Sequence, residues 1–189
     1  MSPVHVVYAH PDPGSFTREV LDAFVGGLSS YTVSDLYGSG FQPVLSAAEY
    51  ARPASDPVPF DVAAEQELLD AAEVWAFVYP VWWADCPAML KGWFDRVWTV
   101  GWAYKPGWGR VARRVVVLCT AGYTVAELEK SGVHQAMRTS MVDDRIGARA
   151  STSDFVVLGG SVLAGSDPAG WASLKADHLA RAASLARSL

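Results

Sequence analysis

Five short apolar runs, separated by helix-like segments, are the feature that most restricts how this chain can fold. The runs are rich in β-branched residues and stay apolar throughout, which is typical of strands buried on both faces. We predict strands over residues 4–9, 31–36, 73–79, 113–119 and 154–158. Helices are predicted over residues 15–28, 61–72, 87–98, 125–140 and 167–189, with an interruption near residue 131.

This alternation predicts an α/β fold, in which a doubly wound, five-stranded parallel sheet carries helices on both faces. The 189 residues, of which 51% are hydrophobic, suffice for one core, so we expect a single domain over residues 1–189. Asp61 and Asp167 are the predicted N-caps of their helices. Residues 37–59 are rich in Gly, Pro, Ser and Ala, and we expect them to form a functional loop.

The net charge of −5 argues against a nucleic-acid or anionic-membrane partner, because both require a positive face. No apolar stretch reaches the length of a membrane span, and the start of the chain has no export signal. Cys86 and Cys119 lack metal-ligand spacing, so reduced thiols are expected. We therefore expect a cytoplasmic protein without membrane insertion or a bound metal.

Seven of the eight tryptophans lie between residues 75 and 108. We interpret this concentration as a sign of a flat ligand or a large self-association surface. Trp75 and Trp93 are expected in the core, whereas Trp83 follows a strand end and is expected at a ligand site.

The junction "HPDPGSFT" leaves the first strand and opens the first helix. Unpaired N–H groups at a helix N-terminus suit a phosphate, and His10, Ser15 and Thr17 add side-chain donors. Both the GxGxxG fingerprint and the P-loop motif are absent, which argues against a nucleoside triphosphate site. Ordinary N-capping by Ser15 explains the junction equally well, although it leaves His10 without a role.

Four segments, taken in order, resemble one known family. They read "AHPDPGSF", "SDLYGSGFQPVLS", "DVAAEQELLDAAEVWAFVYPVWWADCPAMLKGWFDRVW" and "CTAGY". The chain resembles the flavodoxin-like NAD(P)H:quinone oxidoreductases of the DT-diaphorase type over roughly its first three quarters. The resemblance implies a flavin-dependent enzyme that transfers a hydride from NADPH or NADH to its flavin, and then reduces a quinone or another flat acceptor by a ping-pong scheme.

The resemblance also assigns residues to the flavin. The phosphate and ribityl end is assigned to His10, Ser15, Phe16 and Thr17, although family members commonly carry Asn in place of Thr17. Trp82 replaces a Gln of the animal enzymes, and Ala84 replaces a Phe. The isoalloxazine ring is assigned to Pro80, Val81, Trp82, Trp83 and Ala84 on one side and to Thr120, Ala121, Gly122 and Tyr123 on the other.

His134 matches the family's catalytic histidine, which is proposed to balance charge on the ring during hydride transfer. The tyrosine that partners it in the family has no counterpart, so Tyr123 is the second catalytic candidate. The alternative is that His134 is an ordinary helix residue without a catalytic role. Gln66, residues 42–46 and Asp95 match stretches near the adenosine of FAD, which favours FAD over FMN; as alternatives, Gln66 lies on a solvated helix face and Asp95 is a surface charge.

The segment "WTVGWAYKPGWG" crosses a two-fold interface in the family and lines the partner's substrate pocket, which assigns Trp102 and Tyr104 to that pocket. A homodimer is therefore expected. Two other functions fit the sequence. One is a flavodoxin-type electron carrier without a small-molecule pocket, and the other is an ancillary regulatory subunit of a potassium efflux system.

Overall fold

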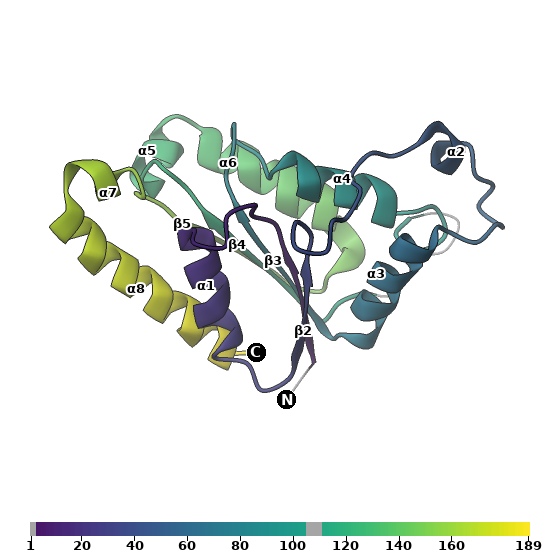
Figure 1. Cartoon of the computed structure of the whole chain (residues 1–189), viewed down its shortest axis with the longest axis horizontal. Coiled ribbons are helices and arrows are strands. Elements are labelled where there is room, and N and C mark those ends of the chain that lie inside the picture. The colour runs from purple at the N-terminus through teal and green to yellow at the C-terminus, as the bar shows by residue number, and fades with distance from the viewer. Residues whose placement is uncertain (1–2, 105–110) are drawn as a thin grey trace.

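A computed structural model describes residues 3–104 and 111–189. Five parallel strands form one sheet in the order β2-β1-β3-β4-β5, and helices cover both of its faces (Figure 1). The predicted fold class is confirmed, and each predicted strand is present with a shift of at most one residue at either end. The strands are β1 Val4–Tyr8, β2 Tyr31–Asp35, β3 Val74–Pro80, β4 Arg114–Thr120 and β5 Ser153–Leu158.

Two helix layers enclose the sheet. Helices α1 and α8 pack together on one face, and α3, α4, α6 and a π-helix cover the other. Within the described residues, no helix is both long and apolar enough to cross a membrane. The helices are α1 Phe16–Val25, α2 Ala47–Tyr50, α3 Phe60–Ala71, α4 Ala88–Val97, α5 Val125–Lys130, α6 Val133–Arg138, the π-helix η1 Thr139–Ile146, the 3₁₀ turn η2 Gly147–Arg149, α7 Leu163–Ser166 and α8 Pro168–Arg187.

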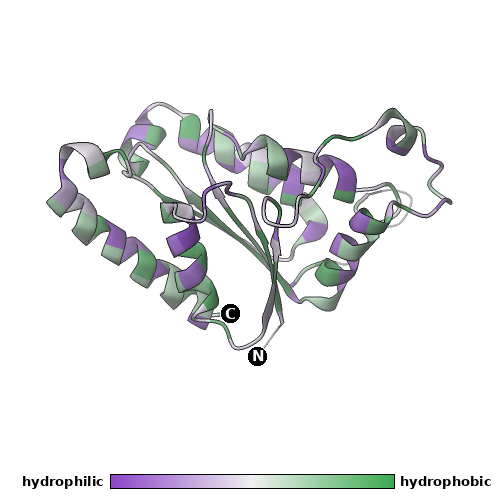
Figure 2. Ribbon diagram, in the orientation of Figure 1, coloured by the Kyte–Doolittle hydropathy of each residue, from purple (hydrophilic) through white to green (hydrophobic). Residues whose placement is uncertain are grey.

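The order of the strands indicates at which edge of the sheet a ligand binds. β2 lies on one side of β1, whereas β3, β4 and β5 lie on the other side. The direction in which successive strands are added to the sheet therefore reverses, and the reversal lies between β1 and β3. In open α/β sheets, ligands bind at the carboxyl ends of the strands beside such a reversal. The central strands are hydrophobic along most of their length (Figure 2), and β3 is buried at all seven positions. Polar groups near the sheet therefore gather in the loops that leave it.

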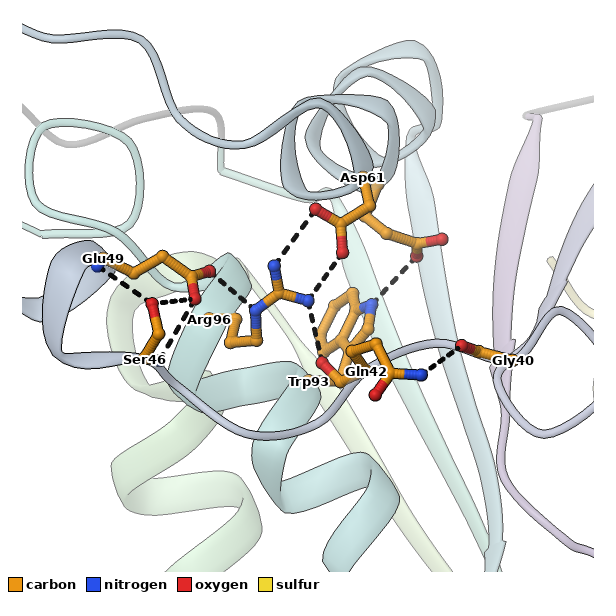
Figure 3. A network of polar contacts seen from close by, with 8 residues as sticks. Gly40, Gln42, Ser46, Glu49, Asp61, Trp93 and Arg96 are labelled. Atoms are coloured by element: carbon orange, nitrogen blue, oxygen red, sulfur yellow. Dashed lines mark hydrogen bonds and ion pairs between the residues drawn. The ribbon is translucent and has the colours of Figure 1, made fainter.

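The predicted N-cap at Asp61 is wrong, because the N-cap of α3 is Pro59, two residues earlier, and the helix begins at Phe60. Instead of capping the helix, the Asp61 carboxylate accepts two hydrogen bonds from the guanidinium of Arg96 in α4, from Nη1 at 2.6 Å and from Nη2 at 3.0 Å (Figure 3). The same guanidinium donates to Glu49 at 2.7 Å and to the Gln42 carbonyl at 2.8 Å. The buried Arg96 thus ties the loop over residues 37–59, which includes α2, to α3 and α4. By contrast, Asp167 caps α8 as predicted.

Residues 125–140, predicted as one interrupted helix, form α5 and α6, which are separated by Gly132 with φ +79°. The helical segment then continues beyond the predicted end as the π-helix, which ends at Ile146. π-Helical segments are uncommon and occur often at functional sites.

Four of the seven clustered tryptophans pack with one another in the interior. This finding corrects our interpretation that their concentration indicates a flat ligand or a self-association surface. Trp75 and Trp93 are buried as predicted, and both pack against Trp98, with ring centroids 5.9 and 5.1 Å apart. Trp102 lies 5.5 Å from Trp98 and completes a cluster of four rings. These rings fill the space between β3 and α4. Trp108 lies outside the described residues.

Candidate active site

The chain segments that leave β1 and β3 are each hydrogen-bonded to the neighbouring strand. The N–H of Ala9 donates to the Val78 carbonyl at 3.1 Å, and that of Val81 donates to the Thr120 carbonyl at 2.7 Å. The hydroxyls of Thr17 and Thr120 are 2.8 Å apart in a buried hydrogen bond between α1 and β4. Segments distant in sequence are therefore anchored at the same edge of the sheet, as the strand order requires.

Two adjoining cavities open at this edge and share Val81, Ala121 and Gly122, so they form the two ends of one slot. The first, of about 330 Å³, is the polar end; the second, of about 760 Å³, is the apolar end. The polar end is lined by His10, Ser15, Phe16, Thr17, Pro80, Val81, Trp82, Thr120, Ala121, Gly122 and Ser161. The apolar end is lined by Val81, Trp83, Ala84, Ala121, Gly122, Tyr123, Glu127, Leu128, Ser131 and Val133.

At the polar end, His10 is oriented by its own loop. Its Nδ1 lies 3.0 Å from the Asp12 N–H and 3.2 Å from the Asp12 carbonyl oxygen. We assign the shorter contact, in which Nδ1 accepts from the N–H, and this assignment places the proton of the neutral ring on Nε2. Burial lowers the pKa of His10, which outweighs the opposing effect of Asp12, and the ring is therefore neutral at pH 7. A neutral ring with Nε2–H can donate one hydrogen bond to an oxygen in the slot.

The N-terminus of α1 adds further donors to the polar end. The Ser15 side chain caps the helix by accepting from the Arg18 N–H at 3.2 Å, so the capping interpretation of Ser15 is confirmed. Capping leaves the first N–H groups of the helix facing the loop, where they suit an anion. Phe16 is held edge-on against Trp171 of α8, with ring centroids 4.9 Å apart. Thr17 is only 2% exposed, and its hydroxyl is bonded to Thr120.

A tight turn after β3 forms one wall of the apolar end. Trp82 and Asp85 pair as an antiparallel bridge, and the two residues between them have positive φ, 53° at Trp83 and 62° at Ala84. The Trp83 side chain is fully exposed and available to a ligand, in agreement with the expectation that it lies outside the core. Burial alone would raise the pKa of Asp85, but hydrogen bonds from Arg145 outweigh it and hold the pKa below its usual range.

The loop after β4 forms the opposite wall. A Cβ built on Gly122 would meet nothing within 4 Å, so packing inside the protein does not require glycine there, whereas a ligand close to the backbone would. Tyr123 lies at the rim and is 66% exposed. Glu127 accepts from the N–H and hydroxyl of Thr124 at 2.8 and 2.7 Å, which lowers the pKa of its carboxyl, so the rim carries one ionised carboxylate.

Four predicted residues lie away from the slot in this chain. The ring of His134 packs against Phe155 of β5, with centroids 5.5 Å apart, and its catalytic assignment stays a prediction. Gln66 is buried rather than solvated, and its amide donates to the Val97 carbonyl at 2.8 Å and to Thr99 at 3.0 Å. The other two, Trp102 in the tryptophan cluster and Tyr104 at the surface, also lie outside both cavities.

The sequence did not single out Ser161, Glu127 or Leu128, although all three line the slot. Ser161 follows β5 directly after Gly159 and Gly160, so the rule that pointed to the loops after β1, β3 and β4 would also have found it. The other two lie on α5, and only the fold shows which side of that helix faces the slot.

Comparison with known proteins places the chain in a family. A family model described as a flavodoxin-like fold matches residues 2–145. The ribosyldihydronicotinamide dehydrogenase (quinone) of Pongo abelii is 32% identical over 161 residues, which cover 71% of this chain and 70% of that protein. An uncharacterized NAD(P)H oxidoreductase of Haemophilus influenzae is 28% identical over 149 residues and covers 73% of each chain.

Solved structures agree with these relatives. An NAD(P)H:quinone oxidoreductase from Methanothermobacter marburgensis is 43% identical and has a TM-score of 0.90, over 98% of this chain and 94% of that one. An azoreductase from Bacillus anthracis has a TM-score of 0.76 at 19% identity, which shows a shared fold. The fold, the slot at the β1/β3 reversal and these relatives lead to one conclusion: the chain belongs to the flavodoxin-like NAD(P)H:quinone oxidoreductase family.

Proposed function

We propose that this protein, as a single domain over residues 1–189, is a flavin-dependent NAD(P)H:quinone oxidoreductase of the cytoplasm. The observation that carries the proposal is the two-ended slot, which has hydrogen-bond donors and a helix N-terminus at one end and a larger apolar space at the other. A flavin has the same polarity along its length, with phosphate and ribityl oxygens at one end and a flat ring at the other. Two buried free cysteines, Cys86 and Cys119, suit a reducing compartment.

The residues present fit a flavin. The neutral His10 ring and the first turn of α1 would donate to phosphate and ribityl oxygens, and Ser15, Phe16 and Thr17 would line that end. The ring would lie between Pro80, Val81, Trp82, Trp83 and Ala84 on one side and Thr120, Ala121, Gly122 and Tyr123 on the other. The open space beside Gly122 supports close approach of a ring to the backbone. A bound flavin would supply the redox chemistry, which is hydride transfer from NADPH or NADH and electron transfer to a quinone or another flat acceptor.

The chain's own residues position the reactants. Trp83 offers a fully exposed aromatic face at the apolar end, which can hold a flat molecule by stacking. The nicotinamide and the acceptor would use this same apolar space in turn, which gives ping-pong kinetics. Tyr123, at the rim, and His134, one residue beyond the lining residue Val133, are the proposed proton-balancing groups.

We propose FAD as the flavin, with FMN as the alternative. Leu45 and Asp95, from stretches matched with the adenosine half of FAD, line a common cavity of about 310 Å³, which supports FAD. The Gln66 amide nitrogen donates within the chain and lends FAD no support.

A homodimer is proposed from the surface around this 310 Å³ cavity. Exposed apolar side chains gather there, including Tyr50 at 83%, Val100 at 38% and Tyr104 at 43% exposure. Such patches mark association surfaces. In a two-fold dimer, Trp102 and Tyr104 are assigned to the substrate pocket of the partner. Of the two, Tyr104 is exposed, whereas Trp102 is half-buried in the tryptophan cluster.

The proposal is tested by releasing the cofactor from purified protein and identifying it by mass. The reconstituted protein is then mixed with menadione and either NADPH or NADH, and oxidation of the nicotinamide is followed. We expect steady turnover without an added reductase and parallel lines in double-reciprocal plots. Protein that binds neither FAD nor FMN would overturn the proposal, and flavin binding without turnover would favour the electron carrier.

A further inference from the structure

The turn that carries Trp83 adopts a conformation that its residues disfavour. The Trp82 N–H donates to the Asp85 carbonyl at 2.9 Å, and the Asp85 N–H donates to the Trp82 carbonyl at 3.1 Å. Positive φ at both central residues defines a type I′ turn, which normally contains Asn-Gly. Within residues 3–104 and 111–189, Trp83 and Ala84 are the two non-glycine residues with positive φ. Such strain persists only where surrounding contacts enforce it.

One side chain from a distant element enforces it here. Arg145 is the penultimate residue of the π-helix, and it donates to both oxygens of the Asp85 carboxylate at 2.6 and 2.8 Å. The Asp85 Oδ1 also accepts from the Cys86 N–H at 2.7 Å, so the carboxylate is fixed against both the guanidinium and the backbone. Paired donation of this kind fixes orientation as well as distance, because the guanidinium is a planar fork.

Arg145 is itself held in place. Its side chain is 10% exposed, and its guanidinium lies over the Phe94 ring at 5.8 Å from the centroid. Its carbonyl accepts from the Trp98 indole at 2.7 Å. The ion pair therefore links a rigid part of the core to a turn that opens on the slot.

We propose that Arg145 is a positioning residue, which acts through Asp85 to hold the left-handed Trp83–Ala84 turn against the apolar end of the slot. This inference rests on the proposed function, because the turn is the wall on which the flavin ring and the acceptor would lie. The charge of Arg145 is balanced by Asp85, so its effect comes from geometry. Arg145 thus determines how tightly the flavin is held and how well a flat acceptor stacks.

The test compares Arg145→Lys with Arg138→Lys. Lysine keeps the charge at residue 145 but loses the paired donation, and Arg138 forms a single 2.9 Å bond with Asp143 at an exposed place in the same helical segment. In Arg145→Lys, we expect the flavin dissociation constant and the KM for menadione to rise by about tenfold, a loss typical of a paired contact, with a smaller change in kcat. Arg138→Lys should leave all three unchanged. Asp85→Asn, which keeps an acceptor for the Cys86 N–H, is a second variant should Arg145→Lys fold poorly.

Rescue separates positioning from general destabilisation. Glycine adopts positive φ without strain, so Ala84→Gly in the Arg145→Lys background should restore most of the flavin affinity. The inference is overturned if Arg145→Lys behaves like Arg138→Lys, or if Ala84→Gly leaves flavin affinity low while the melting temperature matches wild type. If the wild-type protein binds no flavin, both the positioning role and the proposed function fail. If the wild type turns over normally and Arg145→Lys has unchanged flavin affinity and KM, the positioning role alone is refuted.

Discussion

The two histidines assigned to the slot differ in what their surroundings allow. His10 lines the polar end with Nδ1 occupied by the Asp12 N–H, so Nε2–H is its free donor. His134 lies on α6 with its ring against Phe155, beside the apolar end rather than in its lining. His10 is therefore the histidine that we propose for cofactor binding, whereas the proton-balancing role proposed for His134 stays a prediction.

We expect His10→Ala to raise the flavin dissociation constant by about tenfold, because one hydrogen bond to a charged oxygen is lost. The kcat of the flavin-saturated enzyme should stay unchanged. His134→Ala serves as the opposite case, with kcat lowered by about a hundredfold and flavin affinity retained. Fluorescence titration of apoprotein and steady-state kinetics measure both quantities. Loss of kcat in saturated His10→Ala would contradict this division of roles.

At the residue scale, the sequence predicts the location of those side chains that directly follow the end of a strand. Ser15, Thr17, Trp83 and Gly122 could be placed at the slot because parallel strands bring their carboxyl ends to one edge. Gln66 could not be placed, because its partners Val97 and Thr99 lie some thirty residues away and only the packing of α3 on α4 joins them.

At the scale of elements, α4 holds the loop over residues 37–59 in place. Its Arg96 holds the loop over residues 37–59, and its Gly92 lets that loop approach closely. A Cβ built on Gly92 would lie 2.7 Å from the carbonyl carbon of Pro43, closer than two nonbonded carbon atoms can approach. The loop backbone therefore rests directly on the helix.

Gly92→Ala should lower the free energy of unfolding by about 1–3 kcal/mol, because the helix and the loop must move apart. Gly165→Ala is the matched control, since a Cβ there meets nothing within 4 Å. Urea unfolding of both variants measures the difference. Equal free energies of unfolding for the two variants would show that the loop can move away from α4 without loss of stability.

The elements that the sequence predicted well are those determined locally. Apolar runs and caps such as Asp167 depend on near neighbours, so the strands and α8 were found. Asp61 was predicted as a cap for the same local reason. Its carboxylate instead pairs with Arg96, which lies 35 residues away in sequence, so the local pattern could not reveal the contact. The π-helix was also missed, because its register depends on packing against the core through Met141 and Ile146.

At the scale of the whole molecule, a buried polar cluster links stability to pH. His5 of β1 lies 2.7 Å from the Thr32 hydroxyl and 3.3 Å from that of Ser34, with its ring fully buried. Burial lowers its pKa from 6.5 to about 4. Between these values the unfolded chain binds a proton that the folded chain does not, so stability falls as the pH drops.

We expect up to about 3 kcal/mol of the free energy of unfolding to be lost between pH 6.5 and pH 4 through His5. The nearby Glu65 has its pKa raised by burial and acts in the opposite direction, so the difference between wild type and His5→Gln isolates the histidine. Urea unfolding at several pH values gives this difference. Parallel curves for the two proteins would rule out the linkage.

The proposed dimer makes a prediction at the same scale. Tyr50 and Phe60 are 83% and 89% exposed, so replacing both with Asp removes little from the core of the chain. The double variant should halve the mass measured by sedimentation, because two buried charges oppose association. Val162→Asp, at 61% exposure on the other side of the slot, should leave the mass unchanged. A wild type that sediments as one chain would contradict the dimer directly.

The tryptophan cluster has an optical consequence. Rings whose centroids lie 5.1 to 5.9 Å apart exchange excitation energy by resonance, so Trp75, Trp93, Trp98 and Trp102 should emit as a coupled group. Flavins absorb where tryptophan emits. A flavin in the slot would therefore quench both this group and Trp83, and the protein's own fluorescence would report how much of its cofactor it has retained.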